Sequence, residues 1–225
     1  VPAPPGSGKT MLVPAAVLDD LPAGQKLVLL QPRRLAARAV AGQIARIRGV
    51  PIGGEVGYQV RFDSAVGRDT RLVVETTGIM LRRLLDDITL PGIGAVVLDE
   101  FHERSLEMDL VLGLLVRLRQ SVRPELRVVV MSATLAAGPV ARLLGTAPAA
   151  CPIVSAEGRL FPVEVRHAPH GPRPDLVEAV AAAVPEALRA TAGHVLVFLP
   201  GVGEIMRCER ELTAAADRQG HAVET

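Results

Sequence analysis

The run Gly6-Ser7-Gly8-Lys9-Thr10 has the residue types of a phosphate-binding loop. Gly6 and Gly8 have no side chain, so backbone N–H groups around them and Ser7 can approach an anionic phosphate closely. Lys9 would reach the β- and γ-phosphates of a nucleotide, and the hydroxyl of Thr10 would ligate Mg²⁺. An apolar, helix-compatible run follows the loop, and the N-terminus of a helix also favours phosphate. These five residues predict a binding site for a magnesium nucleotide.

Two adjacent acidic residues, Asp99 and Glu100, follow the apolar run 94–98. In a nucleotide hydrolase Asp99 would hold the Mg²⁺, directly or through water, and Glu100 would orient or deprotonate the attacking water. A helix N-cap is the alternative, and it would explain only one of the two carboxylates. Together with Lys9, the acidic pair predicts a catalytic site for nucleoside-triphosphate hydrolysis.

Three further polar residues, His102, Ser132 and Thr134, lie close to the ends of apolar runs. By hydrogen bonding, His102 could connect the bound nucleotide with the Ser132 and Thr134 segment. The alternative is that His102 is an ordinary polar residue and that the other two belong to a strand-to-turn junction. The residues alone leave both interpretations open.

The range 31–48 holds five arginines and no acidic residue, with Arg33 and Arg34 directly after an apolar run. A run of charges usually forms a solvated helix face. The other interpretation is contact with a nucleic-acid phosphate backbone, because open α/β sheets bind ligands where their strands end. Spacing alone does not decide between the two.

Short apolar runs that alternate with helical patterns must position these residues. Alternation of this kind predicts an α/β fold with a parallel sheet flanked by helices. Right-handed crossovers place the carboxyl ends of all the strands, and so all the polar motifs, along one edge. We expect strands at 26–30, 71–75, 94–98 and 127–131, a strand or extended loop at 57–62, and helices to about 48 and at about 79–85, 106–120 and 139–144.

Small residues and prolines dominate 145–155, which predicts a linker. We therefore expect a first domain at 1–150 and the start of a second at 151–225. In the second we predict strands at 161–166 and 194–199, a helix at 175–190 that Pro185 kinks or ends, and a helix to about 216. Because a strand is expected before the phosphate loop and the second block is short, we expect the sequence to be a fragment.

Composition narrows the function classes. The 225 residues are 49% hydrophobic, enough for a buried core, and the net charge of +1 gives no overall attraction to nucleic acid. The two cysteines have neither metal-site nor disulfide spacing, and the apolar runs are too short to span a bilayer. With no signal peptide recognised, we expect a cytoplasmic protein without a membrane partner.

Seven segments, in order, resemble the motifs of superfamily 2 helicases of the DEAH/RHA type. Phe101, where that group usually has alanine, resembles its bacterial HrpB branch. The segments are Pro-Pro-Gly-Ser-Gly-Lys-Thr, Gln-Pro-Arg-Arg-Leu-Ala-Ala, Gly-Tyr-Gln-Val-Arg-Phe, Thr-Thr-Gly, Asp-Glu-Phe-His-Glu-Arg, Ser-Ala-Thr and Phe-Leu-Pro-Gly-Val-Gly-Glu-Ile.

The resemblance implies a RecA-like domain and part of a second one, with ATP between them and a single nucleic-acid strand crossing both. It implies that Ser132–Thr134 couples hydrolysis to strand movement. It also implies that Arg33, Arg34 and Thr76 contact the nucleic-acid backbone. The implied function is an ATP-dependent helicase that accepts other nucleoside triphosphates and acts on RNA in preference to DNA.

Three positions depart from the family pattern. Ala3 stands where the phosphate loop usually has a glycine, and Thr77 stands where the family usually has an acidic residue. Gln43 stands where we expect an arginine near the base of the nucleotide. The motifs that would carry arginine fingers are not in the sequence. Because an arginine finger raises turnover by orders of magnitude, we expect this chain alone to bind a magnesium nucleotide, to hydrolyse it poorly and not to unwind a duplex.

Two alternative functions remain. One is a DNA-directed translocase of the same fold, since phosphate contacts do not distinguish ribose from deoxyribose. The other is a nucleotide-gated switch that binds a protein partner without unwinding. Aromatic residues are only 2% of the chain, so we expect phosphate contacts rather than base stacking to dominate strand binding.

Overall fold

The computed structural model describes residues 1, 7–133, 137–145, 149–155, 162–167, 175–190 and 193–219. The chain forms two compact units, Val1–Leu160 and Phe161–Thr225. The sequence-based boundary after residue 150 remains a prediction. Within the described ranges, no helix combines the length and apolar character needed to cross a bilayer.

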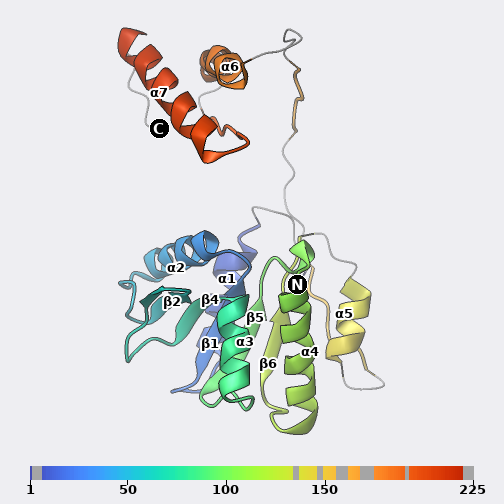
Figure 1. Ribbon diagram of the computed structural model, residues 1–225. Coiled ribbons are helices and arrows are strands. Elements are labelled where there is room, and N and C mark those ends of the chain that lie inside the picture. Colours follow the sequence, from blue (N-terminus) through green and yellow to red (C-terminus); the bar gives the residue numbers. More distant parts are fainter. Residues whose placement is uncertain are drawn as a thin grey trace. The chain divides into compact units, whose positions relative to one another are not determined.

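The first unit is built on a six-stranded sheet with the order β3-β2-β4-β1-β5-β6 (Figure 1). All neighbouring strands are parallel except β2 and β3, which form an antiparallel hairpin. The predicted strands at 26–30, 71–75, 94–98 and 127–131 are confirmed to within a residue at either end, and 57–62 contributes a strand. The strands are β1 (Lys26–Gln31), β2 (Val56–Val60), β3 (Asp63–Ala65), β4 (Leu72–Thr76), β5 (Ile93–Leu98) and β6 (Arg127–Val130).

Helices cover both faces of this sheet, as predicted (Figure 1). Helices α1 and α2 pack on one face, and α3, α4 and α5 pack on the other. Helix α3 begins two residues earlier than expected, directly after β4. The helices are α1 (Lys9–Asp19), α2 (Arg34–Arg48), α3 (Thr77–Asp86), α4 (Leu106–Ser121) and α5 (Ala137–Leu144), with a 3₁₀ turn η1 (Phe101–Glu103).

Alternating side chains of the central strands divide the core into two layers. Leu27 and Leu29 of β1 belong to the layer under α1 and α2, whereas Val28 and Leu30 belong to the layer under α3 and α4. This division follows from the two-residue period of a strand. Every residue of β5 is buried, as expected for a parallel strand covered on both faces. The buried strands give the polar residues that follow them a rigid support.

The second unit contains two packed helices, α6 (Leu176–Ala190) and α7 (Val202–Gln219). Val177 and Val184 of α6 and Cys208 of α7 are buried. The predicted helices are therefore confirmed, and α6 continues past Pro185 rather than ending there.

Both predicted strands of the second unit are wrong for its described residues. Neither 162–167 nor 194–199 is assigned as a strand. Their alternating apolar residues fit a strand, but a strand also needs a hydrogen-bonded neighbour. The described part of this unit supplies none.

The core beneath the acidic pair can be tested with Leu98→Ala. Leu98 is fully buried at the end of β5, and truncating a buried leucine removes apolar burial and leaves a cavity. We expect the free energy of unfolding to fall by roughly 2–5 kcal/mol, measured by urea denaturation. Leu35→Ala on α2 is the matched control, because Leu35 is 80% exposed. Equal effects of the two substitutions would contradict this packing.

Candidate nucleotide and nucleic-acid site

The described part of the phosphate loop leads directly into α1. Gly8 precedes the helix with φ of 79°, in the left-handed region that glycine adopts readily. The Lys9 side chain, at 8% exposure, is buried, and among the described residues it has neither an ion-pair nor a hydrogen-bond partner. The hydroxyl of Ser7 is also buried and unpaired within the described structure. Gly6 lies outside the described residues.

A lysine that is largely buried and has no counter-charge among the described residues is uncommon, because burial of a charge is unfavourable unless the charge is paired. An anion at the loop would supply the missing charge. The unpaired donors of Lys9 and Ser7 therefore fit a phosphate ligand.

Val1 lies at the edge of the sheet where the parallel strands end. Its carbonyl accepts a 3.2 Å hydrogen bond from the Ser132 N–H, and its amino group donates to the Val130 carbonyl. Residue 1 thus lies alongside the end of β6. Helix α1, which follows the loop, packs against β1 and β5.

Asp99 is fully buried at the end of β5, and both its carboxylate oxygens accept hydrogen bonds. The Gln31 side-chain Nε2 donates to Oδ2 at 2.7 Å, and the Glu100 N–H donates to Oδ1 at 2.9 Å. These two contacts fix the orientation of the carboxylate. Our sequence reasoning assigned no role to Gln31, although a polar residue at the end of an apolar strand was a signal that could have found it.

Glu100 occupies a different environment from Asp99. Its side chain is 31% exposed, and its backbone has φ of 50°. Positive φ is uncommon for a residue other than glycine and often accompanies functional sites. The two acids are thus suited to different tasks. The buried Asp99 is suited to hold a cation, and the more accessible Glu100 is suited to contact a water molecule.

His102 does not hydrogen bond to Ser132 within the described structure. Its Nδ1 lies 3.3 Å from Glu100 Oε2, but the angles do not make a hydrogen bond. The Ser132 hydroxyl is likewise buried without a partner among the described residues. Thr134 lies outside those residues.

The acidic turn is instead joined to the end of β6 through the backbone. The Phe101 N–H donates to the Met131 carbonyl at 3.1 Å, and the Met131 N–H donates to the Leu98 carbonyl at 2.8 Å. In the described structure these backbone hydrogen bonds, rather than a hydrogen bond of the His102 side chain, connect the acidic turn with the segment that leads to Ser132.

The three predicted nucleic-acid residues follow two neighbouring strands. Arg33 and Arg34 follow β1, and Thr76 ends β4 opposite Gln31 in the parallel register. Arg34 is exposed. Arg33 Nη2 lies 3.3 Å from a carboxylate oxygen of Glu103 in the acidic turn, and both side chains are partly solvated. The structure therefore groups these residues at one edge and gives Arg33 an acidic partner.

An ion pair between the buried Glu75 and the partly exposed Arg83 supports the backbone around Thr76. Glu75 is fully buried, and Arg83 Nη2 of α3 lies 2.9 Å from its Oε2 and 3.2 Å from Gln59 Oε1. Burial raises the pKa of Glu75, and the Arg83 guanidinium opposes that rise. The pair connects the end of β4 with α3, which follows it directly. No sequence pattern indicates that Glu75 and Arg83, eight positions apart, are in contact.

The β2–β3 hairpin presents an exposed aromatic ring that sequence reasoning also missed. Phe62 is 88% exposed with φ of 69°, and the Arg61 guanidinium lies 4.7 Å from its ring centroid. A bulky residue at positive φ is strained. The tip offers a flat apolar face beside a cation.

The residues that could hold Mg²⁺ are Asp99 and Thr10. No group of three or more His, Cys, Asp or Glu side chains in the described ranges is arranged to hold a metal ion by itself. Magnesium is commonly bound by one or two carboxylates together with substrate phosphates. The buried carboxylate of Asp99, whose oxygens each keep a further lone pair, fits that mode.

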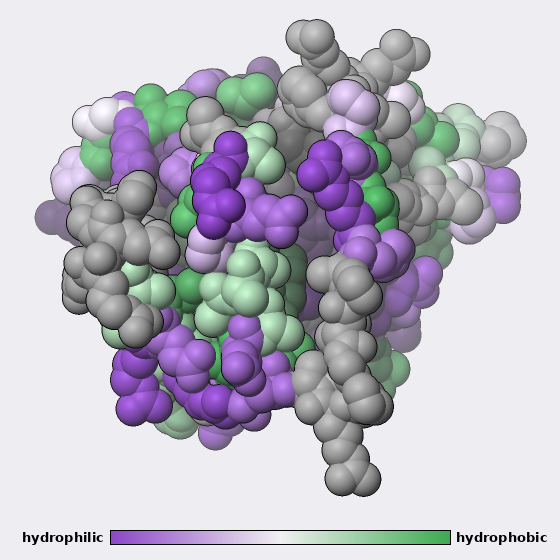
Figure 2. All heavy atoms as spheres, turned by 90° about the horizontal axis from the view of Figure 1, so that it is seen from above, coloured by the Kyte–Doolittle hydropathy of each residue, from purple (hydrophilic) through white to green (hydrophobic). Residues whose placement is uncertain are grey.

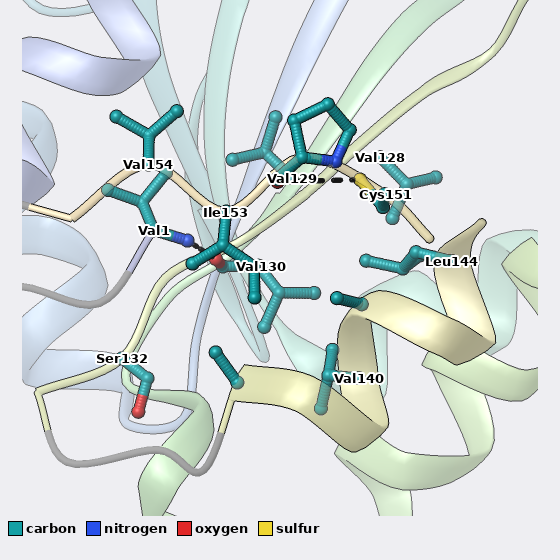
Figure 3. A pocket seen from close by; sticks show the side chains of 13 residues that line it. Val1, Val128, Val129, Val130, Ser132, Val140, Leu144, Cys151, Ile153 and Val154 are labelled. Carbon is teal, nitrogen blue, oxygen red and sulfur yellow. Dashed lines mark hydrogen bonds between the residues drawn. The ribbon is translucent and has the colours of Figure 1, made fainter. Parts of the chain in front are cut away.

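A cavity of about 300 Å³ lies beside β6 and is distinct in chemistry from this site. Figure 3 shows Val130 of β6, Val140 and Leu144 of α5, and Cys151 and Ile153 around it. Its lining side chains carry no charge, and Ser132 contributes the only hydroxyl among them.

The face drawn in Figure 2 does not carry one continuous hydrophilic area among its described residues. In Figure 2, hydrophilic residues occur in separate groups with hydrophobic residues between them. The net charge of +1 likewise gives no strong overall field.

Comparison with known proteins gives consistent results. The model of the DEAD/DEAH box helicase family matches residues 1–143. The chain is 44% identical over 212 residues to "ATP-dependent RNA helicase HrpB" of Escherichia coli, covering 94% of this chain and 26% of that protein. It is 36% identical over 219 residues to "ATP-dependent RNA helicase HrpA" of the same organism, covering 94% of this chain and 16% of that protein.

A solved structure agrees with these sequence matches. The crystal structure of the E. coli DEAH/RHA helicase HrpB matches with a TM-score of 0.82 and 43% identity, covering 95% of this chain and 27% of that chain. These comparisons confirm the resemblance indicated by the motifs, together with the RecA-like fold. The chain spans about a quarter of the length of HrpB.

The ion pair of Glu75 with Arg83 predicts a pH dependence that Glu75→Gln should remove. Because the pKa of Glu75 is raised in the folded state, the native protein binds the proton more tightly than the unfolded chain. The free energy of unfolding should therefore fall as pH rises from the ordinary carboxyl range to the raised pKa. Urea denaturation across that range should show this fall in the wild type and a flatter profile in the variant. Parallel profiles would contradict it.

Proposed function

Because the chain belongs to the DEAD/DEAH box helicase family, we propose that it is the nucleotide-binding part of an ATP-dependent helicase. It would couple nucleoside-triphosphate hydrolysis to movement along single-stranded nucleic acid, with RNA favoured over DNA. The observation that carries this proposal is Lys9, a largely buried residue without a counter-charge among the described residues, at the sheet edge where Asp99 and Glu100 follow β5. The names of the similar proteins HrpB and HrpA, both RNA helicases, support RNA.

The phosphate loop binds the nucleotide. Backbone N–H groups of Gly6, Ser7 and Gly8 surround the phosphates, and Lys9 offsets the charge of the β- and γ-phosphates. Thr10 and Asp99 hold Mg²⁺. When bound, the ion neutralises charge that develops on the phosphate oxygens. ATP is the proposed substrate, with other nucleoside triphosphates accepted.

Glu100 orients the attacking water and accepts its proton. Its partial exposure allows water to reach the carboxylate, whereas Asp99 is shielded. His102, 3.3 Å from Glu100, is placed to restrict the position of that carboxylate. The two acids thereby divide metal binding and proton transfer between them.

Coupling to strand movement passes through Ser132 and Thr134. Support comes from the backbone contact between Phe101 and Met131, which joins the acidic turn to the segment preceding Ser132. A displacement of one turn would shift the other, because this hydrogen bond and the hydrogen-bonded pairing of β5 with β6 connect them.

Arg33, Arg34 and Thr76 contact the backbone of the nucleic-acid strand. They lie after adjacent parallel strands, so a single extended strand could meet all three. Phe62 adds a surface on which a base could stack, which revises our expectation that stacking has little part in binding.

The domain organisation and location belong to the same proposal. Residues 1–150 form the RecA-like ATP-binding domain, and 151–225 begin a second RecA-like domain. The protein acts in the cytoplasm on nucleic acid.

The proposal predicts nucleotide turnover that depends on Glu100 and is stimulated by RNA. Glu100→Gln in the intact protein should lower ATP turnover by roughly 10²–10⁴-fold, the usual contribution of a general base. Turnover would be measured with and without single-stranded RNA or DNA of equal length. The wild type should respond more strongly to RNA than to DNA.

Glu107→Gln is the matched control, since Glu107 is an exposed acid on α4. It should leave turnover unchanged. A stronger response to DNA would favour the translocase alternative. If neither nucleic acid changes the rate, the motor function is wrong, and the nucleotide-gated switch becomes the better account.

Phosphate contacts by the proposed arginines predict a strong salt dependence. Arg33→Ala in the intact protein should weaken binding of single-stranded RNA and reduce the slope of log affinity against log salt by about 0.7, the value for one phosphate contact on a single strand. Fluorescence anisotropy at several salt concentrations would measure it. Arg68→Ala should leave the slope unchanged, because Arg68 is exposed on the loop before β4, at the opposite edge. Equal slopes for all three proteins would remove Arg33 from the interface.

A further inference from the structure

We infer that Gln31 is a positioning residue for the metal-binding carboxylate of Asp99, and that it links this carboxylate to the turn that carries the proposed nucleic-acid arginines. The inference rests on the proposed function, because it assigns Asp99 to Mg²⁺. It adds a residue to which neither the motifs nor the comparisons give a role.

The contact between the two side chains is buried and short. Gln31 is 2% exposed, Asp99 is fully buried, and Nε2 of the former lies 2.7 Å from Oδ2 of the latter. The two residues are 68 positions apart in sequence. A side-chain amide at this depth requires hydrogen-bond partners, and a carboxylate is the strongest acceptor that it can meet.

Gln31 and the backbone hold the Asp99 carboxylate at both oxygens. Oδ2 accepts from Gln31, and Oδ1 accepts from the Glu100 N–H at 2.9 Å. Rotation about the terminal bond of Asp99 would break both hydrogen bonds. Each oxygen still has a lone pair available, because an ionised carboxylate accepts at about four positions. Gln31 therefore fixes the direction of the carboxylate without occupying all of its acceptor sites.

Gln31 also lies between the residues proposed to bind the nucleotide and the residues proposed to contact nucleic acid. In the parallel register it lies opposite Thr76 of β4, and Arg33 follows two positions later. The side chain of Arg33 in turn approaches Glu103 at 3.3 Å. The end of β1 and the turn after it thus contact the acidic turn at two points, one buried and one exposed. The buried contact ends at the carboxylate proposed to hold Mg²⁺.

A purely structural role for Gln31 makes a different prediction. If Gln31 served only to fill space and satisfy buried polar atoms, its loss would lower stability and leave metal binding intact in the folded protein. If it orients Asp99, metal binding must weaken even where folding is preserved. Outer-sphere partners of metal ligands typically change metal affinity by roughly 10–100-fold.

The test compares wild type with Gln31→Met and Gln31→Asn in the intact protein. The Met variant keeps the length of the side chain and removes its N–H donors, whereas the Asn variant keeps the amide but shortens its reach. Binding of a fluorescent N-methylanthraniloyl ATP analogue would be titrated first without divalent cation and then with increasing Mg²⁺. Thermal unfolding in EDTA would verify that each variant is folded.

We expect both variants to bind the analogue without Mg²⁺ within about twofold of wild type, because the phosphate loop is unchanged. The Mg²⁺ concentration needed for half of the metal-dependent gain in affinity should rise by roughly 10–100-fold for Gln31→Met. Gln31→Asn should show a smaller rise.

Thr70→Val is the matched control for the loss of a buried hydrogen bond. Thr70 is fully buried and donates to the Gly54 carbonyl at 2.7 Å, at the opposite end of β4 from Thr76. It should lower the melting temperature and leave the Mg²⁺ requirement unchanged. A folded Gln31 variant with the wild-type Mg²⁺ requirement would overturn the inference alone. A wild-type protein that binds the analogue without any Mg²⁺ dependence would overturn the proposed metal site itself.

Discussion

Parallel hydrogen bonding between β1 and its two neighbours determines where the polar residues of the site can lie. Leu30 of β1 is in register with Leu98 of β5, and Gln31 is in register with Thr76 of β4. Because the three strands run in the same direction, their carboxyl ends lie side by side. Residues that are far apart in sequence thereby meet at one edge, and the buried strands behind them hold that edge in place.

The site contains three buried residues of charged type, and they differ in their hydrogen-bond and ion-pair partners. Asp99 receives two hydrogen-bond donors, and Glu75 has the Arg83 guanidinium. Lys9 has no partner among the described residues. A charge that is already paired serves to fix geometry, whereas an unpaired charge creates affinity for a ligand. This difference explains why Lys9 carries the proposal of phosphate binding.

The acidic turn connects several parts of the site through short contacts. Phe101 joins it to the end of β6 through the backbone, and Glu103 approaches Arg33 from the turn after β1. Each contact crosses between neighbouring strand ends. The proposed coupling between nucleotide and nucleic acid therefore follows from the sheet order, since only adjacent strands can exchange contacts of this length.

The amino-acid sequence predicted the helices and every strand but β3 of the first unit, because these follow from apolar periodicity. It also led to the roles proposed for Lys9, Asp99 and Glu100, because those rest on residue types at fixed spacings. It failed for the strands expected at 161–166 and 194–199, because a strand requires a partner that periodicity does not supply. Tertiary structure alone decided the contacts of Gln31 with Asp99, and of Arg33 with Glu103. These depend on strand order and register, which bring together residues that no local pattern connects.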